Sequence, residues 1–362
     1  MNELMVCLVV TLLSGLVVFL AEGPLRKLLL RSGIVDHPNK RSSHEVPTAR
    51  GGGVVILAVI GSGSMWLGWH MESQVTYYLA LLSLLLTLVS WVDDVKGLSA
   101  KLRLGCHVAA GVCGALAIGA ASLQMDFGGG LSWQPPAMLG FSLAVFYLVG
   151  FTNAFNFMDG IDGLAAGQAA LTAASAGLLS GLATHSWGEA PVLFSFLVAG
   201  SCAGFIPHNF PQARIFMGDV GSVPVGFLLA CLSIWTAQQS QWWLLIPLVM
   251  LQANFILDTF LTFVRRVVRG ERWNEAHHEH FYQRLVRAGM SHTVVTLWEI
   301  GLQTVVVLLM IAYLHVGAEA RVGLIGSVIV LWLAFFCYCE FQFRRFSRGE
   351  IGNACEKLRR EA

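Results

Sequence analysis

Long apolar segments occupy most of this 362-residue chain and limit what it can fold into. Hydrophobic residues make up 56% of the sequence and charged residues 12%, a composition that suits lipid as the surroundings of the fold. A membrane-spanning helix needs about 20 mostly apolar residues, and the runs lack the alternation of membrane barrel strands. The sequence therefore predicts an all-α, polytopic membrane protein with about eleven spans in a single domain, residues 1–362. The expected spans are residues 4–22, 51–70, 77–92, 104–121, 137–156, 164–182, 190–207, 222–238, 242–263, 292–315 and 321–341.

The basic residues predict how these spans are oriented. When each loop is numbered by the span that it follows, the odd-numbered loops and the tail after the last span hold every Lys and Arg except Arg321. Basic loops stay in the cytoplasm, so we expect the odd-numbered loops and a short basic tail from about residue 343 to be cytoplasmic and the N-terminus to lie outside. The first span has no small-residue cleavage site, and we expect it to remain as an anchor.

Five polar clusters lie in or beside the odd-numbered loops, so this orientation brings them to one face of the membrane. The first cluster, residues 36–53, contains prolines, basic residues and the run Gly51–Gly53, whose backbone can come close to a ligand. It is interpreted either as an anion-binding loop for phosphates or as an ordinary basic loop that anionic lipid headgroups attract.

Two adjacent acids, Asp93 and Asp94, end the third span. They repel each other and oppose the helix dipole, so a positive partner is expected. Lys96 and Lys101 can supply it in a purely structural arrangement. The alternative is a site that orients or deprotonates a phosphate nucleophile or helps to bind a metal.

The end of the fifth span carries Asn153, Asn156 and Asp159 at a spacing of three, which places them on one side of a helix. Gly160 and Gly163 mark a break where irregular backbone can line a polar cavity. Amide and acid oxygens of this kind suit a hard cation such as Mg²⁺. A structural polar network is the alternative.

Two further carboxylates lie at the start of a span or inside one. Asp219, in the run FMGDVGS before the eighth span, is interpreted either as a helix cap or, together with the preceding cluster, as a metal ligand. Asp258 lies inside the ninth span, where an unpaired carboxylate is costly. We expect it to pair with Arg265 or Arg266.

The ninth loop holds His277, His278 and His280 among several arginines. It does not match the HExxH pattern of zinc proteases, because Tyr282 stands where the second histidine is needed. Histidine and arginine side chains together suit the oxygens of a diphosphate. A solvated or pH-sensitive loop is the alternative.

Taken in order, WVDD at 91–94, TNAFNFMDGIDGLAAG at 152–167, FMGDVGS at 216–222 and the histidine-rich ninth loop resemble the polyprenyl-phosphate N-acetylhexosamine-1-phosphate transferases. The resemblance covers almost the whole chain. It implies transfer of a sugar 1-phosphate from a UDP-N-acetylhexosamine to undecaprenyl phosphate, with release of UMP, at the cytoplasmic face of the bacterial inner membrane. It also implies a requirement for Mg²⁺, for which Mn²⁺ can substitute. The sequence HHEHFYQRL is most similar to the WbpL-type branch that initiates O-antigen synthesis, often with 6-deoxy sugars such as FucNAc or QuiNAc, or with GlcNAc.

The resemblance assigns roles to individual residues. It implies that Asp219 and Asn156 contact the metal, and that Asp93, Asp94 and Asp159 are catalytic acids near the carrier phosphate. The residues that it implies for binding the nucleotide are Asp162, Lys101 and Phe216. The residues that it implies for the diphosphate and the sugar are Asn153, His277, His278 and His280, and those for the carrier phosphate are Lys40 and Arg50.

The main alternative function is secondary transport of an anionic substrate, which predicts polar residues at the bilayer midplane. The polar clusters of this chain lie at span ends instead, where we expect an active-site cleft on the cytoplasmic face. The expected partners are undecaprenyl phosphate, the UDP-sugar and the lipid bilayer, with a homodimer left open. No nucleic acid is expected.

Overall fold

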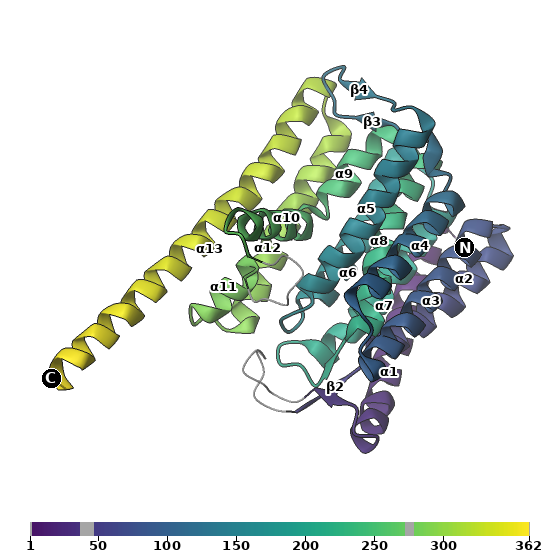
Figure 1. The fold of residues 1–362 in the computed structure, drawn as a ribbon. Coiled ribbons are helices and arrows are strands. Elements are labelled where there is room, and N and C mark those ends of the chain that lie inside the picture. The colour runs from purple at the N-terminus through teal and green to yellow at the C-terminus, as the bar shows by residue number, and fades with distance from the viewer. Residues whose placement is uncertain (1, 37–46, 272–278, 362) are drawn as a thin grey trace.

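The computed structural model describes residues 2–36, 47–271 and 279–361, which form a bundle of long helices (Figure 1). Helices dominate because in lipid each backbone group needs a hydrogen-bond partner, and a helix supplies it within its own segment. The long helices are α1 (Glu3–Arg31), α2 (Gly53–Met71), α3 (Gln74–Lys96), α4 (Ala100–Ala117), α5 (Ala137–Met158), α6 (Leu164–Thr184), α7 (Ala190–Asn209), α8 (Asp219–Gln239), α10 (Ala253–Val268), α12 (His292–His315) and α13 (Ala318–Glu361). The short ones are η1 (Ala120–Ser122), η2 (Trp242–Leu244), α9 (Leu245–Met250) and α11 (Phe281–Arg287).

The predicted class, an all-α polytopic membrane protein, is confirmed. Within the described residues, eight single helices are long and apolar enough to cross a membrane, namely α1, α2, α3, α5, α7, α8, α12 and α13. A bent pair, residues 242–250 with residues 253–268, forms a ninth candidate. Helices α4 and α6 occupy two further predicted spans but fall outside this set, so the number eleven stays a prediction.

The ninth predicted span, residues 242–263, is wrong as one straight helix. It bends by 64° between α9 and α10, at Leu251 and Gln252. Buried amides bind the backbone at this break: the carbonyl oxygen of Leu251 accepts hydrogen bonds from Gln168 Nε2 at 3.0 Å and from Gln303 Nε2 at 2.7 Å. Irregular backbone inside a membrane protein needs such partners, because no water is available to replace them.

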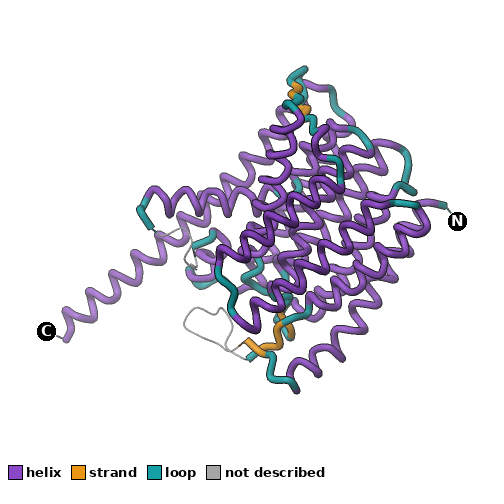
Figure 2. Tube along the Cα trace, turned by 45° about the vertical axis from the view of Figure 1, so that its right-hand side comes forward, coloured by secondary structure: helices purple, strands orange, loops and turns teal. Residues whose placement is uncertain are grey.

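Helix α8 is the buried centre of the bundle, packed among α2, α3, α5, α6 and α7. Residues 220–237 of this helix are all buried, as expected for a helix surrounded by other helices. Helix α13 packs on α10, α11 and α12 and then extends beyond the bundle (Figure 2). The basic tail predicted from residue 343 therefore continues the last helix as far as Glu361.

A small sheet joins two distant connections at one end of the bundle. Strands β1 (Val35–Asp36) and β2 (Thr48–Arg50) pair in the antiparallel direction, and β2 pairs in parallel with β5 (Ile215–Phe216). At the other end, β3 (Met125–Asp126) and β4 (Ser132–Trp133) form a separate hairpin before α5. The pairing of β2 with β5 brings the loop before α2 to the loop before α8.

Candidate active site

The run Gly51–Gly53 packs against the backbone of the segment that precedes α8. Its predicted approach to a ligand stays a prediction. The amides of Gly51 and Gly52 donate to the carbonyl oxygen of Phe216, at 3.1 and 2.9 Å. These hydrogen bonds directly follow the pairing of β2 with β5. A Cβ on Gly53 would lie 2.1 Å from the Cα of Gly221. Only glycine permits this approach, and it fixes the first predicted cluster against the start of α8.

This packing places the side chain of Arg50 beside Asp94 and Asp219. Its Nη2 lies 2.8 Å from Asp219 Oδ1 and 3.2 Å from Asp94 Oδ1. The three residues come from β2, the first turn of α8 and the last turn of α3. Asp219 also lies at the positive end of the helix dipole of α8, which stabilises its negative charge. Three of the predicted site residues are thus in direct contact.

Asp93 points elsewhere and has different partners from Asp94. Its Oδ2 lies 2.9 Å from Arg103 Nη1, and its Oδ1 accepts a hydrogen bond from the amide of Leu98 at 2.7 Å. Neighbouring residues of a helix point about 100° apart, which separates the two acids. The structure thus places Arg103 of α4 beside Asp93, whereas the sequence had suggested Lys96 or Lys101. Lys101 itself is exposed in the first turn of α4.

The end of α5 contributes the amide and the third acid. Asn156 Oδ1 accepts a hydrogen bond from Ser222 Oγ of α8 at 2.6 Å, and Asp159 follows the last residue of α5. Burial raises the pKa of the Asp159 carboxyl to about 7; the charge of Asp219 also raises this pKa, and Arg50 lowers it. The ends of α3 and α5 and the start of α8 therefore meet in one acidic group, as the sequence predicts.

Asn153 is turned toward α4, one helical turn away from Asn156. Its Oδ1 lies 3.1 Å from His107 Nδ1, and its Nδ2 donates to the carbonyl oxygen of Val149 at 2.7 Å. His107 is buried and was not singled out by the sequence, where it is a lone histidine inside an apolar span. Its contact with Asn153 links α4 to the polar side of α5.

The residues predicted to bind the nucleotide lie on three different elements. Asp162 follows α5, and its Oδ2 accepts a hydrogen bond from the amide of Ala213 at 3.2 Å and lies 3.5 Å from His292 Nδ1. Phe216 belongs to β5, and Lys101 lies in the first turn of α4. The role of these three residues stays a prediction.

Of the predicted histidines, His280 is described and buried, whereas His277 and His278 lie outside the described residues, as does Lys40. The expected pairing of Asp258 with Arg265 or Arg266 is wrong. Arg265 lies 3.6 Å from Glu340 and Arg266 lies 3.1 Å from Glu271. The partner of Asp258 is His280 Nδ1, at 2.8 Å.

The acidic group has the donor chemistry that a magnesium ion needs. The group contains three carboxylates and one cation, namely Asp94, Asp159 and Asp219 with Arg50. Asn156 adds an amide oxygen, and hard cations prefer such oxygen ligands. In the part of the chain that the structure describes, no three His, Cys, Asp or Glu side chains are already arranged to hold an ion. The side chains fit a cation by chemistry, and its binding belongs to the proposal below.

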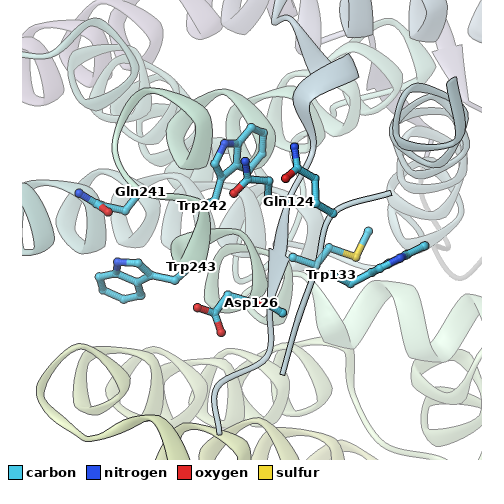
Figure 3. A pocket seen from close by; sticks show the side chains of 9 residues that line it. Gln124, Asp126, Trp133, Gln241, Trp242 and Trp243 are labelled. Atoms are coloured by element: carbon cyan, nitrogen blue, oxygen red, sulfur yellow. The ribbon is translucent and has the colours of Figure 1, made fainter. Parts of the chain in front are cut away.

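A separate cavity has a volume of about 400 Å³, and Figure 3 shows the side chains that line it. Its lining includes Asp126, Trp133 and Trp242, which come from the connections before α5 and after α8. The acidic group follows α5 and begins α8, so the length of a 22-residue helix, about 33 Å, separates the two sites. Interfacial tryptophans are common at the ends of membrane helices, and the cavity is not part of the candidate active site.

The chain matches a known family through the same segments. The family described as "Glycosyl transferase family 4" matches residues 76–237, a range that includes Asp94, Asn156, Asp159 and Asp219. The decaprenyl-phosphate N-acetylglucosaminephosphotransferase of Mycobacterium tuberculosis is 31% identical over 314 residues, which cover 80% of this chain and 78% of that protein. The chain belongs to the family described as "Glycosyl transferase family 4".

Two further relatives are similar to this chain. A probable undecaprenyl-phosphate N-acetylglucosaminyl 1-phosphate transferase of Bacillus subtilis is 29% identical over 83% of this chain and 84% of its own length. A phospho-N-acetylmuramoyl-pentapeptide-transferase of Synechococcus is 39% identical over 49% of this chain and 52% of its own length. The resemblance to polyprenyl-phosphate sugar-1-phosphate transferases is confirmed, and the chain is an integral membrane transferase of that kind.

Proposed function

We propose that this protein transfers an N-acetylhexosamine 1-phosphate from a UDP-sugar to undecaprenyl phosphate, and that it thereby initiates O-antigen or another surface polysaccharide. The observation that carries the proposal is the contact of Arg50 with both Asp94 and Asp219. It joins three segments of the chain into one charged group at the ends of membrane helices. A lipid carrier that stays in the bilayer can present its phosphate at such a place.

The reaction forms a bond between an oxygen of the carrier phosphate and the β-phosphorus of the UDP-sugar, and it breaks the bond from that phosphorus to the bridging oxygen, which leaves with UMP. Phosphate monoesters are largely ionised at neutral pH, so the attacking oxygen needs little help from a base. The side chains then act mainly by positioning and by balancing charge. Arg50 is suited to hold a phosphate, because its planar guanidinium offers paired donors.

A bound Mg²⁺ would neutralise the diphosphate, and Asp219 and Asn156 are the proposed groups that hold it. Asp94 and Asp159 line the same place and keep the attacking and leaving groups in position. Asp93 is held by Arg103, and we propose that it fixes the turn from α3 to α4 near the carrier phosphate. We further propose that this end of the bundle faces the cytoplasm, as the distribution of basic residues predicts.

The donor is proposed to be a UDP-N-acetylhexosamine. The relatives from Mycobacterium tuberculosis and Bacillus subtilis carry N-acetylglucosamine in their names, which supports UDP-GlcNAc. The ninth-loop sequence resembles the branch that uses 6-deoxy sugars, which supports UDP-FucNAc or UDP-QuiNAc. These donors differ at carbon 6 or in ring stereochemistry, so a direct comparison separates them.

The test uses the full-length protein in lipid nanodiscs with undecaprenyl phosphate, Mg²⁺ and each UDP-sugar in turn. We expect UMP release that depends on the carrier, together with a polyprenyl-diphospho-sugar that mass spectrometry identifies. The matched control is Asp219→Asn, which keeps the shape of the side chain and should remove turnover. If no UDP-N-acetylhexosamine gives UMP, and proteoliposomes instead move the nucleotide sugar across the bilayer, the protein is a transporter and the proposal is wrong.

A further inference from the structure

Asp258 is a fully buried acid in the membrane region. Its hydrogen-bond partners come from its own helix, α10, and from the start of α11. It lies in α10, just after the bend, and its side chain is 1% exposed. A buried carboxylate is strongly destabilising unless hydrogen bonds compensate it. Its Oδ1 lies 2.8 Å from His280 Nδ1 and accepts a hydrogen bond from Thr262 Oγ1 at 3.2 Å. Its Oδ2 accepts a hydrogen bond from the amide of Phe281 at 2.9 Å.

Both oxygens of Asp258 therefore bind the first residues of α11. That helix has only seven residues, and a helix so short has little stability of its own. His280 is the residue at its N-terminal cap, and the backbone amide of His280 donates to Gln283 Oε1 at 3.2 Å. Asp258 thus fixes both the imidazole of His280 and the direction in which α11 starts.

Helix α11 in turn packs against the end of α5. The hydroxyl of Tyr282 donates to the carbonyl oxygen of Phe157 at 3.0 Å, and the His280 ring lies 6.2 Å from the Phe157 ring. A Cβ on Gly160 would lie 2.0 Å from the hydroxyl oxygen of Tyr282. Two residues, Met158 and Asp159, lie between these two contact points, and Asp159 is one of the proposed catalytic acids. The position of Asp159 therefore depends on where α11 is held.

We infer that Asp258 is a positioning residue for the transfer reaction: through His280 and α11 it holds the Phe157–Gly160 turn, and with it Asp159, in the active geometry. The inference rests on the proposed function. Asp258 itself touches neither substrate nor metal in this account. It connects the half of the ninth span that follows the bend to the start of α11.

The chain offers a matched control in Glu299 of α12. It is also a buried acid, 1% exposed, and its Oε2 accepts a hydrogen bond from Asn254 Nδ2, one turn before Asp258 on α10, at 2.7 Å. This partner, Asn254, belongs to α10 and not to α11. Asp258→Asn and Glu299→Gln each replace a buried carboxylate by an amide of the same shape. A purely structural role predicts similar effects of both substitutions.

The experiment measures thermal unfolding and steady-state UMP release for both variants in nanodiscs. We expect Glu299→Gln to keep most of the wild-type kcat. We expect Asp258→Asn to lose about tenfold or more in kcat, with a smaller change in KM for the UDP-sugar, because misplaced positioning groups cost up to about 100-fold in rate. Equal losses of kcat in the two variants, in proportion to the loss of folded protein, would overturn the inference.

A double-mutant cycle tests the route through His280. If Asp258 acts by way of that imidazole, the double variant Asp258→Asn with His280→Ala should be no slower than His280→Ala alone. Multiplied losses would show that the two residues act independently and would overturn the inference. Absence of turnover in the wild-type protein with every UDP-sugar would instead count against the proposed function, so the two failures are distinguishable.

Discussion

The substitution Gly53→Ala tests whether close backbone packing sets the active geometry. The new Cβ would lie 2.1 Å from the Cα of Gly221 and 2.5 Å from its amide nitrogen. Backbone atoms cannot rotate aside as a flexible side chain can, so α2 and β2 must move away from α8 by about 1 Å. Overpacking of this kind costs about 1–3 kcal/mol of folding stability.

The same shift should reduce activity by much more than the loss of folded protein. Arg50 stands three residues before Gly53, and its contacts of 2.8 and 3.2 Å with Asp219 and Asp94 would lengthen with the backbone. A displacement of about 1 Å in positioning groups costs about 100-fold in rate. We therefore expect about 100-fold slower UMP release at a temperature where the variant is still folded.

Gly61→Ala is the matched control, because it lies in the same helix and a Cβ there meets nothing within 4 Å. Alanine is the better helix former by about 1 kcal/mol, so this control should be at least as stable as the wild-type protein and fully active. Thermal unfolding in nanodiscs and initial rates of UMP release measure both effects. Wild-type activity in a well-folded Gly53→Ala variant would refute the reasoning.

Three more outcomes are expected. Arg50→Lys keeps the charge but loses the paired donors, so kcat/KM should fall by about tenfold or more. The control Arg103→Lys should lower kcat/KM less, and equal losses would show that Arg50 does not hold a phosphate in the reaction. Removal of divalent cations with a chelator should stop UMP release, and Mg²⁺ or Mn²⁺ should restore it in the wild-type protein but not in Asp219→Asn; full activity in chelator would contradict the metal proposal. Green fluorescent protein fused after the C-terminus should fluoresce, and a fusion before the N-terminus should not, because it folds only in the cytoplasm; the reverse pattern would invert the predicted orientation.

Part of the candidate site could be predicted because its signal is local. Asn156 and Asp159 lie at the end of a span, Asp94 ends another, and Asp219 begins a third, so counting spans was enough to bring them to one end of the bundle. The residues that the sequence reasoning missed or misassigned are those with distant partners. Arg103 pairs with Asp93, ten positions away, and no pattern in the sequence favours it over the nearer lysines.

The bend in the ninth span was also beyond local reasoning. The run 242–263 is apolar enough to look like one helix, and the amides that bind its break, Gln168 and Gln303, come from α6 and α12. Without those partners the broken backbone would be too costly in a membrane. The partner of Asp258 was misassigned for the same reason, since arginines on its own helix were the only candidates that the sequence placed nearby.

The sequence by itself determined that lipid surrounds the fold, that the fold is all-α, and at which end of the bundle the polar residues lie. It could do so because apolar length and the placement of charge act over short stretches of chain. The tertiary structure alone decided which charges touch. Arg50 and Asp219 are 169 positions apart, and their contact exists because Gly53 and Gly221 allow two backbones to meet. Such contacts depend on how helices rotate and pack against one another, which no single segment specifies.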